Sequence, residues 1–285
     1  MTASSAAPAG FVDSRDGTRI AWWQQLGPAA DLERPALILV HGATVDHTAF
    51  RTVGPRFGAR RRVITIDRRG RGQSGDGQPY AIEREYEDVA AVVDWLAGRT
   101  GRSVDVLGHS FGGRCGLGAA LLTTNLRRLV VYEGAPAPAD RSFQDADLLA
   151  RLDALTAAGD LDGVMATFMA DVVGLSPDEV ETYRQSPTWP SRAAAAPTAI
   201  RELRAEAGRD AASEPFAEIR IPILQLIGAD SPEIFAGGTR ELDALLVDGR
   251  LISLRGQKHA AHHTSPELFV AVVEGFLDER DTIAP

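Results

Sequence analysis

A serine at position 110 stands in a Gly-x-Ser-x-Gly pattern, directly after the strand-like run at residues 103–107. A serine hydroxyl is a good nucleophile only when it is exposed, close to a base and close to donors that stabilise the developing oxyanion. A tight turn from a strand into a helix exposes the serine but leaves no room for side chains on its neighbours. Gly108 and Gly112 meet that demand, so the pattern predicts that Ser110 is a nucleophile.

Four further segments carry residues suited to the same chemistry. They are Leu39–Ala43, Ile66–Ser74, Leu226–Asp230, and Gly256–His259 followed by Pro266. Together with the serine motif, and in this order, they resemble the α/β-hydrolase superfamily over nearly the whole chain. The resemblance implies an α/β fold with an eight-stranded, mostly parallel sheet and flanking helices. We expect no cofactor, and we expect no metal because the histidines lack partner ligands at a recognisable spacing.

The base of the reaction has to be chosen among three histidines close to the C-terminus. In the family pattern, the catalytic histidine stands about seven residues before the proline that opens the last helix. His259 has this spacing from Pro266, whereas His262 and His263 do not. The resemblance therefore implies that His259 accepts the proton of Ser110.

A carboxylate must hold the base in one tautomer, and two candidates follow strands. The resemblance implies Asp230, at the end of the seventh expected strand, and Glu133 at the end of the sixth is the alternative. The family pattern also implies an oxyanion hole formed by the backbone N–H groups of Ala43 and Phe111.

The elements that would position these residues follow from the apolar pattern. We expect strands at Phe11–Asp13, Arg19–Gln25, Ala36–Val40, Val63–Ile66, Val104–Leu107, Leu129–Tyr132, Ile221–Ile227 and Leu251–Leu254. Between the sixth and seventh strands, about 80 residues carry helical signals only, at 147–158, 160–173, after a capping box at Ser176, and at 198–207. We therefore expect a hydrolase core at 1–136 and 216–285, with a helical cap at 137–215.

The cap should shape the substrate pocket. We expect an apolar pocket with contributions from the cap residues Met165, Phe168, Met169 and Trp189, and from His47 beside the oxyanion loop. At helical spacing, the same cap residues are also suited to form the cap's own core. His41 is expected to orient the oxyanion loop, and Cys115 is expected to be a small core residue.

Composition narrows the class of protein further. The 285-residue chain has 30 basic and 39 acidic residues, a formal net charge of −9, which disfavours nucleic-acid and anionic membrane surfaces as partners. One cysteine excludes an intrachain disulfide. The first residues lack the basic and apolar regions of a signal peptide, and no apolar run is long enough for a membrane span. We expect a cytoplasmic protein whose partner is a small-molecule substrate.

These residues together favour a serine hydrolase that cleaves a small, apolar ester, thioester or lactone through an acyl-enzyme. A serine nucleophile disfavours the epoxide hydrolases and haloalkane dehalogenases of the superfamily, which carry aspartate at this position. Two alternatives stay open: a non-hydrolytic enzyme of this fold, such as a lyase, cyclase or tailoring enzyme with the same triad, and a ligand-binding receptor.

Overall fold

Each of the eight short apolar runs forms a strand in the computed structural model, which describes residues 7–138, 146–206 and 213–279. The strands are β1 (Gly10–Asp13), β2 (Arg19–Gln25), β3 (Leu37–Val40), β4 (Val63–Ile66), β5 (Val104–His109), β6 (Leu126–Tyr132), β7 (Ile223–Gly228) and β8 (Gly249–Leu254). The alternation of apolar strands and helices along the sequence therefore predicted the sheet correctly.

The strands form a single sheet in the order β1-β2-β4-β3-β5-β6-β7-β8. β1 and β2 form an antiparallel hairpin, whose turn has Gly17 at a φ of 82°, and β2 pairs antiparallel with β4. From β4 to β8 all neighbours are parallel. The loops that follow these parallel strands therefore meet at one edge of the sheet, where the candidate site residues were expected.

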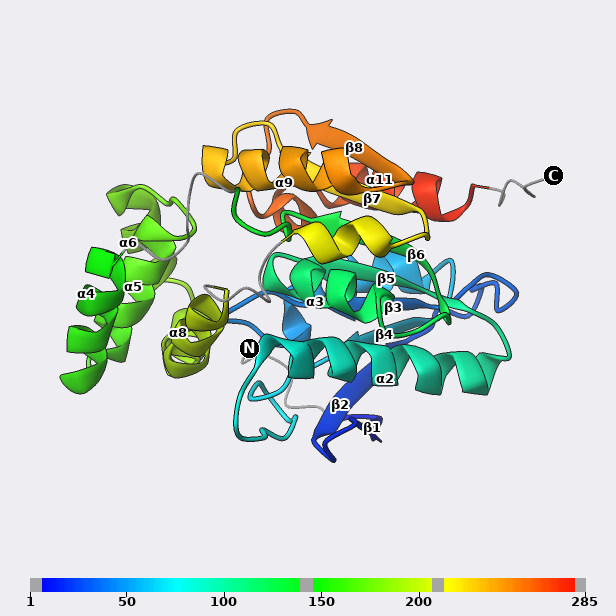
Figure 1. Cartoon of the computed structure of the whole chain (residues 1–285), viewed down its shortest axis with the longest axis horizontal. Helices are drawn as coiled ribbons and strands as arrows, with labels where there is room; N and C mark the ends of the chain where they lie inside the picture. The colour runs from blue at the N-terminus through cyan, green and yellow to red at the C-terminus, as the bar shows by residue number, and fades with distance from the viewer. Residues whose placement is uncertain (1–6, 139–145, 207–212, 280–285) are drawn as a thin grey trace.

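Helices cover both faces of the sheet (Figure 1). They are η1 (His47–Phe50), α1 (Gly54–Gly58), α2 (Ile82–Thr100), α3 (Phe111–Ala120), η3 (Glu214–Glu218), α9 (Glu233–Leu245), α10 (Ala261–Thr264) and α11 (Pro266–Leu277). One apolar cluster joins α2 and α3 to the sheet, and a second joins η1, α1 and α11 to it. No helix within the described ranges combines the length and the apolar character needed to cross a lipid bilayer.

In the described part of the chain, five α-helices stand between β6 and η3, and they gather at one side of the core (Figure 1). They are α4 (Ala146–Ala157), α5 (Leu161–Asp171), α6 (Pro177–Arg184), α7 (Trp189–Ala194) and α8 (Ala196–Ala205). The expected capping box is present, with the Ser176 hydroxyl accepting from Glu179 N–H and the Glu179 carboxylate accepting from Ser176 N–H. Helix α7 was not expected, and residue 207 lies outside the described residues.

Buried arginines of the loop after β4 join this cap to the core. Arg68 contacts Glu85 of α2 at 2.8 Å and also contacts Glu202 of α8, and Arg71 contacts the same Glu202 at 2.7 Å. All four side chains are buried. Because a buried charge is tolerated only with a partner, these contacts fix where α8 lies against the core.

Candidate active site

The chain turns sharply at Ser110, between β5 and α3. Ser110 has φ 53° and ψ −130°, a conformation that costs energy in a residue with a side chain. A Cβ on Gly108 would lie 2.4 Å from Gly112 O, and one on Gly112 would lie 2.2 Å from Val40 O. Only glycine fits at these two positions, which is the physical reason for the Gly-x-Ser-x-Gly pattern.

The loop after β3 passes directly against this turn. A Cβ on Gly42 would lie only 2.9 Å from Ser110 Cβ, so the loop can approach the serine only with glycine there. Ala43 and Phe111 both line a small cavity of about 50 Å³ that also includes Ser110 and His259. Phe111 is the first residue of α3, where a backbone N–H has no acceptor within the helix. The two residues expected to form the oxyanion hole are thus brought together at the serine.

His41 holds that loop in place, as expected. Its Nδ1 donates to Gly42 O at 2.8 Å, and its Nε2 accepts from Arg68 N–H at 3.0 Å. The ring is fully buried, and burial, with the nearby Arg68 guanidinium, keeps the pKa of His41 well below its usual value. His41 is therefore neutral, and its two hydrogen bonds hold the loop after β3 in place.

The carboxylate that contacts His259 is Glu133. Its Oε2 lies 2.5 Å from His259 Nδ1, and its side chain is fully buried whereas the histidine is 15% exposed. The other carboxylate oxygen, Oε1, accepts from Gly228 N–H at 2.7 Å and from the Ser231 hydroxyl at 2.6 Å. These contacts hold both oxygens, so Glu133 can orient the imidazole through a hydrogen bond from Nδ1–H.

The expectation that Asp230 contacts His259 is wrong in this structure. Asp230 is exposed, and within the described residues its carboxylate makes no hydrogen bond to His259. The chain after β7 packs closely against the histidine loop through its backbone. The segment before His259 crosses the end of β7 so closely that a Cβ on Gly228 would lie 2.4 Å from Gln257 O, and Asp230 N–H donates to that same carbonyl. The backbone of Asp230 is thus held beside the histidine loop, while its side chain is exposed at the cavity that His259 also lines.

Side chains from β5 and β6 hold the loop that carries His259. The Tyr132 hydroxyl donates to Lys258 O and accepts from Ala261 N–H at 2.9 Å, so it binds the loop on both sides of the histidine. His109 Nε2 lies 2.8 Å from His259 O. Phe235 of α9 stacks on the imidazole, with ring centroids 4.6 Å apart. His259 is thus positioned by groups from three elements of the core, β5, β6 and α9.

Three histidines that do not contact Glu133 lie in the same region. Burial lowers the pKa of His109 and of His262 well below the usual value, and neighbouring histidines add to the effect. Burial, with the charges of Arg51 and Arg192, lowers the pKa of His263 to about 4. These three rings are therefore neutral near pH 7.

A cavity of about 600 Å³ lies between the core edge and the cap, and both Ser110 and His259 line it. This volume is in the range of small-molecule sites, which is about 300–1,000 Å³. Of the residues expected to line the pocket, Phe168 and Met169 do so. The cavity also has a polar side, formed among others by Thr44, Tyr183 and Arg192.

Three of the expected pocket residues lie elsewhere. Met165 is fully buried in the apolar cluster of the cap, and Trp189 packs in the same cluster with its indole N–H donating to Asp162. The helical spacing of these two residues places them in the core of the cap, as the second interpretation of the pattern predicted. His47 stacks on Trp23, with ring centroids 3.5 Å apart, and lines neither cavity.

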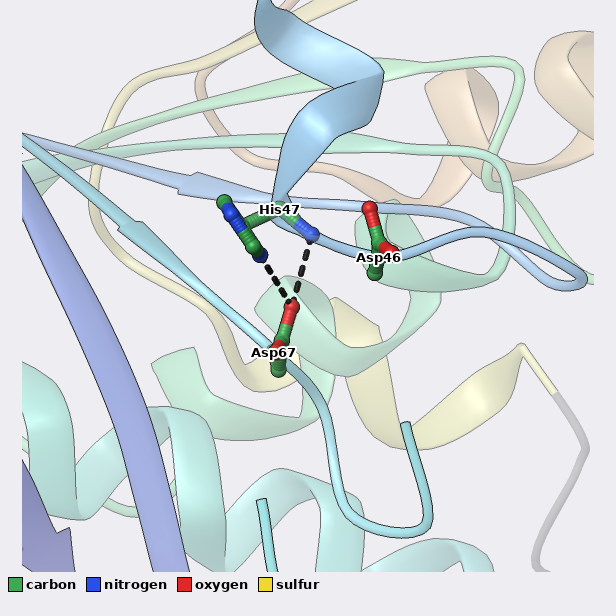
Figure 2. A group of neighbouring side chains, drawn as sticks. All are labelled: Asp46, His47 and Asp67. Carbon is green, nitrogen blue, oxygen red and sulfur yellow. Dashed lines mark hydrogen bonds and ion pairs between the residues drawn. The ribbon is translucent and has the colours of Figure 1, made fainter. Parts of the chain in front are cut away.

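His47 belongs to a group of possible metal ligands with Asp46 and Asp67. Figure 2 shows that both the backbone N–H and the ring of His47 contact Asp67 Oδ1, at 2.7 and 2.8 Å. The other Asp67 oxygen accepts from Gln73 N–H, and Asp46 Oδ1 accepts from both the N–H and the hydroxyl of Thr48. These bonds give the group a structural role, which is to join the start of η1 to the loop after β4.

Residues that the sequence analysis missed also surround the reacting groups. Phe235, Tyr183, Thr44 and Arg192 carry no motif, and no local pattern distinguishes them from other aromatic, hydroxyl or basic residues. Backbone strain is what distinguishes one of them. Among described non-glycine residues, positive φ occurs only at Thr44, Ser110 and Glu133, and such strain concentrates at functional sites.

Comparison with known proteins agrees with this fold. Residues 37–272 match the profile of the alpha/beta hydrolase family. The crystal structure of an alpha/beta hydrolase from Sphaerobacter thermophilus DSM 20745 has 33% sequence identity and a TM-score of 0.79, with 93% of this chain and 99% of that chain covered.

Two curated relatives are named for hydrolytic activities. A 2-(acetamidomethylene)succinate hydrolase from Mesorhizobium japonicum is 24% identical over 254 residues, which cover 86% of this chain and 88% of the relative. A pimeloyl-[acyl-carrier protein] methyl ester esterase from Neisseria meningitidis is 26% identical over 274 residues, which cover 85% and 77%. With the profile match across most of its length, the chain belongs to the alpha/beta hydrolase family.

Proposed function

We propose that this protein is a serine hydrolase that cleaves a small ester, thioester or lactone through an acyl-enzyme, with Ser110, His259 and Glu133 as its catalytic residues. The observation that carries the proposal is the contact of Glu133 Oε2 with His259 Nδ1, at the edge of the cavity that Ser110 also lines. A buried carboxylate at Nδ1 keeps the proton on that nitrogen, so Nε2 is left with a lone pair.

In the first half of the reaction, Ser110 Oγ attacks the acyl carbon while His259 Nε2 accepts the hydroxyl proton. The carbonyl oxygen becomes an oxyanion, which the N–H groups of Ala43 and Phe111 stabilise. The tetrahedral intermediate then collapses, and the leaving group departs with the proton from His259. In the second half, His259 takes a proton from water, the hydroxide attacks the acyl-enzyme, and the acid is released as Ser110 regains its proton.

Hydrolytic names among the relatives support hydrolysis over the other chemistries of this fold. The cavity volume, about 600 Å³, supports a small substrate over a polymer or a long lipid. The core edge supplies the reacting groups, and the cap supplies the opposite wall with Phe168 and Met169.

The test is a panel of short-chain 4-nitrophenyl esters and acyl thioesters with the wild type and Ser110→Ala. In a comparable serine hydrolase, loss of the nucleophile lowers kcat by about 10⁶-fold, and we expect a loss of that order here. Ser253→Ala, on the exposed side of β8, is the matched control and should keep the wild-type rate. Equal turnover by wild type and Ser110→Ala would contradict the proposal.

A further inference from the structure

Arg192 of α7 is a cation in the wall of the large cavity. Its Nη1 donates to Thr44 Oγ1 at 3.1 Å, and its guanidinium carbon lies 5.0 Å from the ring centroid of Tyr183. Its Nε is buried and has no hydrogen-bond partner among the described residues. A guanidinium has five N–H donors, and the bond to Thr44 uses one of them, so the guanidinium of Arg192 has further donors without an acceptor among the described residues.

Three arginines buried in the described part of the core have close carboxylate partners, whereas Arg192 is partly buried. Arg61 contacts Glu274 at 2.7 Å, Arg69 contacts Asp88 at 2.6 Å, and Arg68 contacts Glu85 as described above. For Arg192, no carboxylate of the described residues lies within ion-pair distance. Arg192 is half-buried, so its charge loses part of its hydration without gaining a carboxylate partner, and an anionic ligand would relieve that cost.

The other charges near the cavity do not supply the missing partner. Asp46 is within electrostatic range of Arg192, but its Oδ1 already accepts two hydrogen bonds from Thr48. Glu179 pairs with Lys258 at 2.9 Å, and Asp230 is exposed. A second guanidinium, that of Arg51, also lines the cavity and adds to the lowering of the pKa of Arg192 that burial causes.

Arg192 lies next to the loop that carries the expected oxyanion-hole residue Ala43. Thr44, to which it donates, directly follows Ala43, whose N–H is assigned to the oxyanion hole, and neighbouring Cα atoms are about 3.8 Å apart. Arg192 therefore contacts the loop that would hold the scissile carbonyl oxygen. A group bound by Arg192 would belong to the same small substrate, a few bonds from that carbonyl.

We propose that Arg192 binds a carboxylate on the acyl part of the substrate, so that the protein cleaves monoesters or monothioesters of short dicarboxylic acids. The proposal rests on the serine-hydrolase function and names its substrate class. Arginine is suited to this role because its planar fork of donors matches a carboxylate. Thr44 and Tyr183 hold the guanidinium in place before the ligand arrives.

The experiment compares two esters that differ in one group. Mono-4-nitrophenyl succinate and 4-nitrophenyl butyrate have acyl chains of the same length, and a carboxylate in the first replaces the methyl group of the second. We expect the wild type to have the higher kcat/KM for the succinate ester. Hydrogen bonds to a charged group contribute about 1.5–3 kcal/mol, so Arg192→Gln should lower the succinate-to-butyrate ratio about 10- to 100-fold.

Two further variants make the result specific. Arg192→Lys keeps the charge but not the fork of donors, and it should give a ratio between those of the wild type and Arg192→Gln. Arg151→Gln removes an exposed arginine of the cap, which pairs with Asp171, and it should leave the ratio unchanged. A wild type without preference for the succinate ester, or an equal ratio in wild type and Arg192→Gln, would overturn the proposal.

Failure of this proposal is distinguishable from failure of the proposed function. Turnover of both esters that depends on Ser110, without a succinate preference, would leave the hydrolase function intact and remove the carboxylate site. If neither ester is turned over, calorimetric titration with monomethyl succinate decides the carboxylate site alone. Binding to the wild type that weakens about tenfold or more in Arg192→Gln would support the site, and equal or absent binding would overturn it.

Discussion

The ends of β6 and β7 are neighbours in the sheet, yet the carboxylates that follow them have different surroundings. Glu133 follows β6 immediately, at a φ of 48°, and its buried carboxylate contacts His259, Gly228 and Ser231. Asp230 stands two residues after β7, and it is exposed. Both strands point to the same edge, so the difference comes from the way in which the chain leaves each strand. At β6 it turns the side chain toward the histidine, and at β7 the histidine loop crosses over the strand end.

Among substitutions that test this comparison of the two carboxylates, Glu133→Gln has the largest expected effect, measured as kcat on a 4-nitrophenyl ester. The glutamine amide would donate to His259 Nδ1, which places the imidazole proton on Nε2, so Nε2 can no longer accept from Ser110. The corresponding change in a protease triad lowers kcat by about 10⁴-fold, and we expect a similar loss.

Circular dichroism and a denaturant midpoint should accompany that measurement, because Glu133 also accepts from Gly228 N–H. A folded Glu133→Gln protein with nearly full activity would show that the carboxylate after β6 does not orient the base.

A second prediction concerns His262, which lies beside the same loop without a hydrogen-bond partner for its Nδ1 among the described residues. Burial keeps the pKa of His262 well below its usual value, so the ring is neutral when folded and protonated when unfolded below about pH 6.5. Such a group lowers stability as the pH falls, by about 1.4 kcal/mol per pH unit.

In His262→Gln this contribution is absent. The loss of unfolding free energy between pH 7.5 and 5 should therefore be smaller than in the wild type. Urea denaturation at the two pH values measures it, and identical pH dependence in both proteins would show that His262 does not titrate in this way.

A smaller effect is expected from Ser231→Ala. The Ser231 hydroxyl donates to Glu133 Oε1 at 2.6 Å, while Gly228 N–H keeps its own bond to the same oxygen. Removal of one of the two donors should lower the free energy of unfolding by about 1 kcal/mol and kcat by less than about tenfold. A loss as large as that of Glu133→Gln would mean that the hydroxyl acts in the reaction itself.

The smallest effect is expected from Asp230→Asn. Exposed substitutions change stability by less than about 0.5 kcal/mol, and kcat should stay within about twofold of the wild type. The same ester assay and denaturant midpoint measure both values. A loss of several orders of magnitude would restore Asp230 as the acid of the site.

The residues show why some of this was predictable from the sequence. The strands and the sharp turn at Ser110 could be predicted from the sequence, because β-branched runs and sterically required glycines leave local patterns. His259 followed from its spacing to Pro266. The contact of His259 with Glu133 and not Asp230 joins segments that are 126 residues apart in the chain, so no local pattern reports it.

The cap shows a different limit. Apolar residues at helical spacing face either the core of the cap or the pocket, and the pattern is the same in both cases. All four expected residues lie in the apolar cluster of the cap, and of these Phe168 and Met169 also line the large cavity, whereas Met165 and Trp189 do not. The sequence could not identify Arg192 as a candidate binding residue. What distinguishes it from other arginines is the absence of a nearby carboxylate among the described residues, and this absence can be seen only in the structure.

The most direct test of the account is the rate at which a fluorophosphonate labels Ser110, because this reaction measures activation of the serine without knowledge of the substrate. Intact mass and peptide mapping give the labelled residue and the rate constant for the wild type, Glu133→Gln and Asp230→Asn. We predict labelling at Ser110, with a rate that falls by orders of magnitude in Glu133→Gln and stays close to the wild type in Asp230→Asn. Labelling of another residue, or a large fall in Asp230→Asn with Glu133→Gln unaffected, would contradict it.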